Sequence, residues 1–252
     1  MNNLLRVLYS ILPNFLKKIA KNFYRKLGSF IILDMDFVNY LSEHFRVSKK
    51  EILWLLKFGN RIDSNLWLIL NPQTEEEEKI FYNTTPFYIF DLAFWHMTLA
   101  QRHFRSKIIK IVKGNVLDYG GGIGDLCLAM SKDGLRVDYA DVGGRTFDFA
   151  KQMFQKKGVN NISMINLNNE NISKNYDTIL AIDVIEHVPN AKEVIFNLIK
   201  HLNKNGRLVV TGLRINEDSQ IHPMHQKINF NKEYLISLGL LSTNEPWLFL
   251  KK

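Results

Sequence analysis

The chain has 252 residues, of which 46% are hydrophobic and 23% charged, and it contains one cysteine, Cys127. This composition excludes a disordered chain and an integral membrane protein, and the single cysteine excludes a disulfide framework and a cysteine-based zinc site. The net charge of +8 is concentrated at the start, because residues 1–33 carry six basic side chains and no acidic one, while the rest carries 27 basic and 25 acidic side chains. A near-neutral remainder does not favour a nucleic acid as partner.

The first predicted element is a basic amphipathic helix in residues 1–33. Apolar side chains recur at helical spacing on one face, and lysines and arginines lie opposite. The charge-free stretch 7–16 is far shorter than the ~20 apolar residues that a membrane-spanning helix needs, and no cleavage site follows it, so we expect the segment to be retained. Two roles stay open: contact of residues 1–26 with an anionic membrane surface, or packing on the rest of the protein. We expect a cytoplasmic protein. If residues 1–26 contact a membrane, we expect that membrane to be the inner one, with the protein bound peripherally at its surface.

Residues 34–112 are predicted to form a second, helical unit, a cap over the remainder. Ser48 and Glu51 fit a capping box, Gly59-Asn60 is expected to break the helix that follows, and Thr74 before four glutamates at 75–78 indicates a further helix start with a solvated acidic first turn. Aromatic residues gather just before position 96, and among them we expect Tyr82 and Tyr88 to face the site. The histidines of helical segments are expected at the surface or in packing positions: His44, His96, His103 and His201.

From Gly114 onward, short apolar runs alternate with helical stretches, which predicts a parallel sheet with helices on both faces. The third unit therefore spans residues 113–252. The expected strands are 116–119, 137–142, 162–166, 178–184 and 208–211, followed by two short ones at 240–242 and 247–250. The expected helices are 124–133, 146–157, 191–203 and 231–238.

The most informative stretch is a glycine-rich turn between the first of these strands and its helix. Glycines stand at 120, 121, 122 and 124, so the dinucleotide-binding spacing fails at Asp125, and a P-loop lysine is missing. Two acids, Asp118 and Asp125, bracket the turn and would repel a phosphate. A cationic ligand suits them better, and S-adenosylmethionine is one, with a sulfonium and an ammonium and no phosphate.

The pattern Asp118-x-Gly120-x-Gly122-x-Gly124 resembles motif I of the class I S-adenosylmethionine-dependent methyltransferases. The resemblance continues with Asp141 at the end of the second strand, Asn166-Leu167-Asn168 after the third, and Asp183-Val184-Ile185-Glu186-His187-Val188 after the fourth. It covers about residues 112–250 and implies a Rossmann-like, doubly wound, mostly parallel seven-stranded α/β fold with an N-terminal α-helical cap.

The resemblance also implies residue roles. The carboxylate of Asp141 is expected to bind both ribose hydroxyls, and Asn166 is expected to contact the adenine. The expected contacts of S-adenosylmethionine are Asp118, Tyr119, Gly120, Gly121, Gly122, Asp141, Val142, Asn166, Leu167, Asp183 and Val184.

The expected reaction is methyl transfer to oxygen or nitrogen of a small-molecule or lipid-like acceptor. A hydroxyl acceptor needs a base, and three candidates follow the fourth and fifth strands: His187, His222 and His225. Together with Asp183 and Glu186 they also form a mixed nitrogen and oxygen donor set, but we predict no metal, since the Glu-His pair is widespread in this family as scaffold. The alternative function is a non-catalytic S-adenosylmethionine-binding regulatory or partner subunit. The sequence does not indicate an oligomeric state.

Overall fold

The computed structural model describes residues 26–213, 223–226 and 231–252. The predicted basic helix of residues 1–33 therefore lies largely outside the described residues, as does His222. Within them, no helix is both long and apolar enough to cross a bilayer.

Residues 35–111 are helical, in five successive segments. These are α3 (Met35–Phe45), α4 (Lys49–Leu70), α5 (Glu75–Thr84), α6 (Phe87–His96) and α7 (Leu99–Ile111). The residue before a helix caps its N-terminus in α4 and α5. The side chains of Ser48 and Thr74 each accept a hydrogen bond from the backbone N–H three residues later, and each completes a capping box, with Glu51 and Glu77 respectively. Both predicted helix starts are confirmed.

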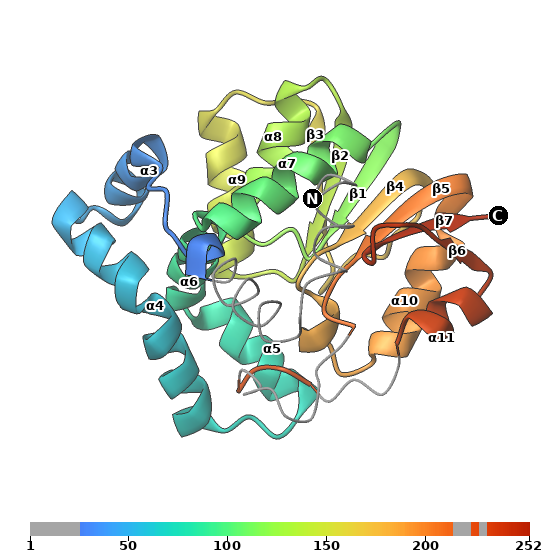
Figure 1. Cartoon of the computed structure of the whole chain (residues 1–252). Helices are drawn as coiled ribbons and strands as arrows, with labels where there is room; N and C mark the ends of the chain where they lie inside the picture. The colour runs from blue at the N-terminus through green and yellow to red at the C-terminus, as the bar shows by residue number, and fades with distance from the viewer. Residues whose placement is uncertain (1–25, 214–222, 227–230) are drawn as a thin grey trace, which may run out of the picture.

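From Asn115 onward, the described residues form one seven-stranded sheet with helices on both faces, as Figure 1 shows. The elements are β1 (Asn115–Tyr119), α8 (Asp125–Lys132), β2 (Arg136–Asp141), α9 (Arg145–Lys156), β3 (Ile162–Asn166), β4 (Tyr176–Ala181), the 3-10 helix η1 (Ile185–His187), α10 (Ala191–Lys200), β5 (Leu202–Val210), α11 (Lys232–Ser237), β6 (Leu240–Ser242) and β7 (Leu248–Lys251). The spatial order is β3-β2-β1-β4-β5-β7-β6, parallel except for β7, which runs antiparallel to both neighbours. The predicted mostly parallel α/β sheet is confirmed, including the two short last strands.

One hydrophobic core joins the helical segment to the sheet. Val38, Ile52 and Phe90 of α3, α4 and α6 belong to the same buried cluster as Val116 of β1 and Phe149 of α9. A second cluster lies on the opposite face and contains Ile195 and Leu198 of α10 with Leu208 of β5. Figure 1 places α7, α8 and α9 over one face of the sheet and α10 and α11 over the other. The helical segment is thus built onto the sheet through a shared core.

The prediction of a helix break at Gly59-Asn60 is wrong, because α4 runs unbroken through this point. Gly59 is buried against α6, where an added Cβ would lie 2.9 Å from the Cβ of Phe90 and 3.3 Å from the amide nitrogen of Asp91. The glycine therefore serves close helix packing, and tertiary contact outweighs its low helix propensity.

The fifth strand also begins earlier than expected. Leu202 already pairs with Tyr176, and the pairing register shifts before Arg207 meets Thr178, so Asn203 to Gly206 form an irregularity inside β5. The predicted helix 191–203 correspondingly ends at Lys200. The Asn205-Gly206 pair, with Asn205 at φ 60°, is accommodated as a bulge.

Replacing Gly59 by alanine is expected to lower the free energy of unfolding by about 1–3 kcal/mol, because the new methyl group must push α4 and α6 apart. Urea denaturation checks this, with Arg61→Ala on the exposed side of the same helix as the matched control. A stabilisation of about 1 kcal/mol, which helix propensity alone would give, contradicts this packing role.

Candidate active site

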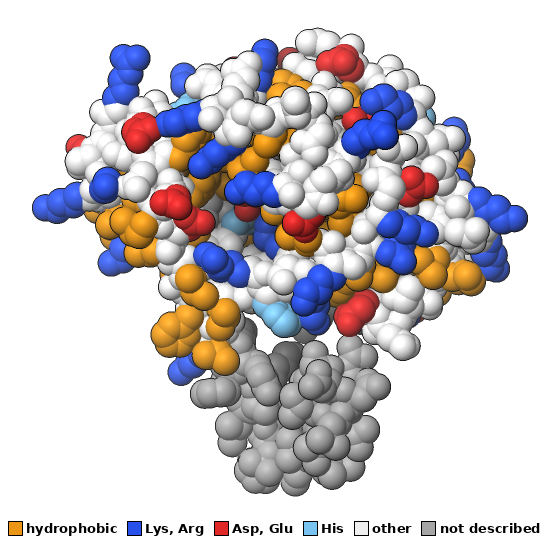
Figure 2. Space-filling view, turned by 90° about the horizontal axis from the view of Figure 1, so that it is seen from above, with side chains coloured by type: hydrophobic (Ala, Val, Ile, Leu, Met, Phe, Trp, Pro, Cys, Tyr) orange, Lys and Arg blue, Asp and Glu red, His pale blue; other side chains and the backbone are white. Residues whose placement is uncertain are grey.

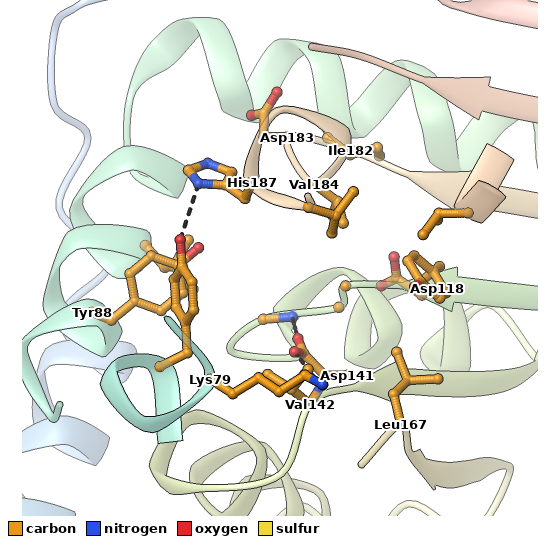
Figure 3. A pocket seen from close by; sticks show the side chains of 18 of the residues that line it. Lys79, Tyr88, Asp118, Asp141, Val142, Leu167, Ile182, Asp183, Val184 and His187 are labelled. Atoms are coloured by element: carbon orange, nitrogen blue, oxygen red, sulfur yellow. Dashed lines mark hydrogen bonds between the residues drawn. The ribbon is translucent and has the colours of Figure 1, made fainter. Parts of the chain in front are cut away.

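A cavity of about 500 Å³ lies at the carboxyl ends of β1, β2, β3 and β4, with helices α5 and α6 opposite. Figure 3 shows its lining from close by. Ligands of open α/β sheets bind at this edge, where the strand order reverses between β1 and β4. Ten of the eleven residues predicted to contact S-adenosylmethionine line this cavity: Asp118, Tyr119, Gly120, Gly121, Gly122, Asp141, Val142, Leu167, Asp183 and Val184.

The glycine turn after β1 brings bare backbone to the cavity wall. Gly120 and Gly122 have φ of 70° and 54°, a left-handed conformation that glycine adopts without strain. A Cβ at Gly120 would lie 2.3 Å from a methyl group of Val184, and one at Gly121 would lie 2.6 Å from the ring of Tyr139. The turn is thus clamped between β2 and the end of β4, and larger residues would close the space that a ligand needs.

Asp141 at the end of β2 faces this turn. One carboxylate oxygen accepts from the backbone N–H of Gly122 and the other from that of Val142, both at 2.7 Å (Figure 3). Burial raises the pKa of Asp141 to about 6, although the two N–H donors favour the ionised form. The side chain is therefore placed by the loop and lies in the cavity wall, where two carboxylate oxygens can meet a vicinal diol.

The acids that bracket the turn differ from each other. Asp118 is 4% exposed and accepts from the thiol of Cys127 at 3.0 Å, and burial raises its pKa. Asp125 lies 2.6 Å from the Arg105 guanidinium and 3.0 Å from Nδ1 of His96. Burial alone would raise the pKa of Asp125, but these two neighbours hold it well below its usual range.

These contacts correct two expectations. Asp125 is not an unpaired acid facing a ligand, since it is neutralised by Arg105. His96 is not a surface or packing residue, because both His96 and Arg105 line the cavity. Nothing in their sequence neighbourhood distinguishes them from ordinary polar residues of a helix, so sequence reasoning missed them.

At the end of β3 the structure places Asn166 and Asn168 differently relative to the cavity. Asn166 is outside the cavity lining, and its side-chain oxygen accepts from the backbone N–H of Asn168 at 3.0 Å in a local turn. Leu167 and Asn168 line the cavity in its place. Asn166, for which a contact to adenine is predicted, is therefore not part of the cavity wall, whereas Asn168 is.

Asp183, just after β4, forms hydrogen bonds with three other side chains of the protein. Its carboxylate accepts from Trp95 at 3.1 Å, Gln101 at 3.2 Å and Thr211 at 2.7 Å. Its φ of 54° is unusual outside glycine, and these hydrogen bonds hold it there. Asp183 thus ties α6, α7 and the end of β5 to the cavity, and its neighbour Val184 supports the glycine turn.

The other end of the cavity is aromatic and carries His187. The hydroxyl of Tyr82 on α5 lies 3.2 Å from Nδ1 of His187, which is the dashed contact above Tyr88 in Figure 3. The Tyr82 ring in turn packs edge-on against Tyr88, with centroids 5.3 Å apart. His225 lies next to His187, with ring centroids 4.8 Å apart. Tyr82 and Tyr88 face the cavity as expected, and two of the three predicted catalytic histidines are adjacent.

Helix α5 closes this end. Glu75, Glu76 and Glu77 of its first turn are exposed, as predicted, whereas Glu78 is half-buried. Glu75 and Glu78 line the cavity with Lys79, which pairs with Glu75 at 3.1 Å, and Glu78 accepts from the side chain of Gln226 at 2.8 Å. Burial raises the pKa of Glu78. Two of the four glutamates thus belong to the site, because helical spacing turns them to the same face.

The face of the described residues seen in Figure 2 does not suggest a nucleic-acid site. Figure 2 shows Lys and Arg side chains scattered among acidic and apolar ones over the face seen there, without one continuous basic area. A basic groove that follows a phosphate backbone is the usual feature of single-strand binding.

Comparison with known proteins agrees with the geometry. Residues 117–208 match the family model described as "Methyltransferase domain". The ubiquinone biosynthesis O-methyltransferase of Rickettsia conorii is 27% identical over 117 residues, which are 46% of this chain and 40% of the relative. The protein of the same name from Rickettsia akari is 25% identical over 150 residues, 59% of this chain and 57% of the relative. The matched region therefore spans about half the length of these relatives.

Among solved structures, TehB from Haemophilus influenzae superposes with a TM-score of 0.50 at 22% identity, over 63% of this chain and 65% of that one. At this identity the likeness shows the fold. The matched domain, with the arrangement of the glycine turn, Asp141 and the ends of β3 and β4, supports a class I S-adenosylmethionine-dependent methyltransferase whose cofactor is S-adenosylmethionine.

Proposed function

We propose that this chain transfers the methyl group of S-adenosylmethionine to a hydroxyl oxygen of a small aromatic or lipid-like acceptor. The O-methyltransferase names of the matched relatives support oxygen as the accepting atom. The aromatic half of the cavity, with Tyr82, Tyr88 and Trp95, supports a planar or apolar acceptor.

At the donor end, Asp141 accepts hydrogen bonds from both ribose hydroxyls, and the glycine turn lets the ligand approach the backbone. The Arg105 guanidinium, held by Asp125 at 2.6 Å, offers its remaining N–H groups as donors to the carboxylate of the methionine portion. Asp118, a buried carboxyl at the end of β1, balances the positive sulfonium end through the field of the site.

The reaction itself is an in-line displacement. An oxygen lone pair of the acceptor forms the new bond to the methyl carbon, the carbon–sulfur bond breaks, and its electron pair returns to sulfur. The hydroxyl also loses its proton. Since charge disperses as the methyl moves, the chain contributes chiefly alignment and exclusion of water.

The observation that carries the acceptor assignment is the hydrogen bond between Tyr82 and His187. It joins α5 to η1 across the cavity and fixes the imidazole by one ring nitrogen, 3.2 Å from the Tyr82 hydroxyl. An imidazole held in this way is suited to orient an acceptor hydroxyl and to take part in the loss of its proton. Burial raises the pKa of Tyr82, so Tyr82 stays a neutral hydroxyl that donates or accepts in this contact.

Replacing His187 by alanine is expected to lower kcat/KM for methyl transfer by about 100-fold, and Tyr82→Phe by about 10-fold, since a ring without the hydroxyl would leave the imidazole unoriented. The assay uses methyl-labelled S-adenosylmethionine with phenols and catechols of increasing apolar size. Matched amines and thiols test the choice of oxygen. His103→Ala, at an exposed position, serves as the control.

Two outcomes contradict the proposal. Unchanged turnover in His187→Ala would remove the role of this histidine. Binding of S-adenosylhomocysteine without turnover of any acceptor would favour instead the non-catalytic binding subunit, because the donor contacts report binding alone.

A further inference from the structure

Trp95 is held at the wall of the cavity by the nitrogen edge of its ring. It is the next-to-last residue of α6, it lines the cavity, and 46% of its surface is exposed. Its indole N–H donates to the carboxylate of Asp183 at 3.1 Å. Trp67, by contrast, is 7% exposed and packs edge-on against Phe81, with ring centroids 5.0 Å apart. Trp95 is therefore anchored by its polar edge, while nearly half of its surface stays uncovered.

The carboxylate that anchors Trp95 is itself fixed. Its Oδ1 accepts from the hydroxyl of Thr211 at 2.7 Å, and the backbone N–H of Asp183 donates to the same hydroxyl at 2.6 Å. Its Oδ2 accepts from Trp95 and, at 3.2 Å, from the side chain of Gln101, which is 8% exposed. Figure 3 shows the Asp183 carboxylate pointing away from the middle of the cavity. The protein itself therefore sets the orientation of the indole, and it does so with a residue in a strained left-handed backbone, a conformation that is most frequent at ligand sites.

Trp95 and its neighbour His96 span the gap between the glycine turn and the end of β4. Trp95 reaches Asp183 just after β4, and Nδ1 of His96 lies 3.0 Å from Asp125, which follows the glycine turn at the start of α8. The binding mode given above places the methionine portion of the donor along this gap, between the ribose contact on β2 and the guanidinium on α7. Since the sulfur atom joins the ribose to the methionine portion, the sulfonium lies beside Trp95.

An indole ring is suited to this position. Among aromatic side chains it attracts a ligand cation over its face most strongly, because its π-electrons make that face negative. A hydrogen bond from the indole N–H to a carboxylate strengthens this potential, since charge-assisted hydrogen bonds polarise the groups that they join. The ring also offers negative potential without an unpaired carboxylate oxygen, a nucleophile that could itself take the methyl group.

We propose that Trp95 recognises the positive charge of the methyl donor and thereby favours S-adenosylmethionine over S-adenosylhomocysteine. The inference rests on the donor binding mode of the proposed function and does not depend on the acceptor. When the acceptor oxygen takes the methyl group, the electron pair of the carbon–sulfur bond returns to sulfur, and the sulfonium becomes a neutral thioether. The attraction to Trp95 is lost with the charge, whereas the ribose, adenine and carboxylate are the same in both molecules. Trp95 therefore promotes binding of the donor and release of the product.

Calorimetric titration of the full chain with each of the two ligands, without an acceptor, tests the inference. We expect Trp95→Leu to weaken the binding of S-adenosylmethionine by about tenfold and that of S-adenosylhomocysteine by less than about twofold. Trp95→Phe keeps a weaker aromatic face without the N–H and should weaken S-adenosylmethionine by about threefold. The inert analogue sinefungin carries an ammonium group in place of the sulfonium and should follow S-adenosylmethionine. Trp54→Leu, at an exposed tryptophan of α4 away from the cavity lining, should leave all three affinities unchanged.

The decisive quantity is the ratio of the affinities for S-adenosylmethionine and S-adenosylhomocysteine in each variant. If Trp95→Leu weakens both ligands equally, the ring serves only as a wall for their shared part, and the proposal is overturned. Unchanged affinities for both would overturn it too. Retained binding of S-adenosylhomocysteine shows that a variant is folded, and should Trp95→Leu fail to fold, an unaltered ratio in Trp95→Phe would overturn the proposal. Binding of neither ligand to the unmodified chain would instead contradict the proposed function.

Discussion

Replacing Asp141 by alanine is expected to weaken the binding of S-adenosylhomocysteine by about 100-fold or more. Two charge-assisted hydrogen bonds to the ribose hydroxyls are lost, each contributing about 1.5–3 kcal/mol. The backbone N–H groups of Gly122 and Val142 also lose their acceptors, which loosens the glycine turn. Isothermal titration calorimetry measures the effect, and Asp133→Ala, an exposed aspartate after α8, is the matched control.

The same carboxylate predicts the pH dependence of donor binding. The pKa of Asp141 is raised to about 6, and the ionised form is the one that accepts from both hydroxyls. The affinity of the unmodified chain should therefore be constant above pH 7 and fall as the pH drops through 6, by up to about tenfold per pH unit. Asp141→Ala should lose this dependence. A variant that binds as tightly as the unmodified chain, or an unaltered pH profile, contradicts the assignment.

Replacing Asp63 by asparagine is expected to stabilise the protein strongly at alkaline pH. Asp63 is fully buried in the middle of α4, where Oδ1 accepts from the hydroxyl of Thr85 at 3.1 Å. Oδ2 has no hydrogen-bond partner among the described residues. Burial, with a smaller contribution from Asp91, raises the pKa of Asp63 to about 7. Asparagine has nearly the same shape and keeps an oxygen for Thr85, but it carries no charge.

The raised pKa of Asp63 determines how the free energy of unfolding changes with pH. Below pH 4 both the folded and the unfolded chain hold the proton, so Asp63 costs little. As the pH rises to 7, the unfolded chain loses the proton first and stability falls, by roughly 4 kcal/mol for a shift of this size. The free energy of unfolding of Asp63→Asn should exceed that of the unmodified chain by this order at pH 8 and be nearly equal at pH 4.

Urea denaturation at pH 4, 6 and 8 measures the difference between the two chains, so that other titrating groups cancel. Asp133→Asn, at an exposed position, should show no such divergence. If Asp63→Asn is destabilised at pH 8, then groups other than Thr85 stabilise the Asp63 carboxylate and its pKa is not raised, which would contradict this account.

The sheet could be predicted from the sequence because local and global signals agree there. Alternating apolar strands and helices, with glycines at 120, 122 and 124, indicate a strand, a turn and a helix in succession, and the structure has β1 and α8 at these places. The two wrong predictions about the fold, a helix break at residues 59–60 and a late start of the fifth strand, both involve glycine. Local propensity misleads at Gly59 and Gly206, because helix packing and strand pairing decide their conformation.

The residues of the site also fall into a group that the sequence could predict and a group that it could not. Residues at strand ends, such as Asp141 and His187, could be placed because the order of the strands brings their ends to one edge. Arg105, His96 and Glu78 come from helices whose position relative to that edge depends on tertiary packing, and their sequence shows only an ordinary polar face. The side-chain partners of Asp125 and Asp183 could not be predicted for the same reason, since most of them lie on α6 and α7.

The most direct measurement of the central claim is a crystal structure of the full chain with S-adenosylhomocysteine. We predict the ribose hydroxyls on the carboxylate of Asp141, the adenine beside Leu167 and Asn168, and the sulfur directed toward the Tyr82 and His187 end of the cavity. A ligand bound away from the glycine turn, or with its sulfur facing away from His187, would contradict the proposed methyl transfer at this site.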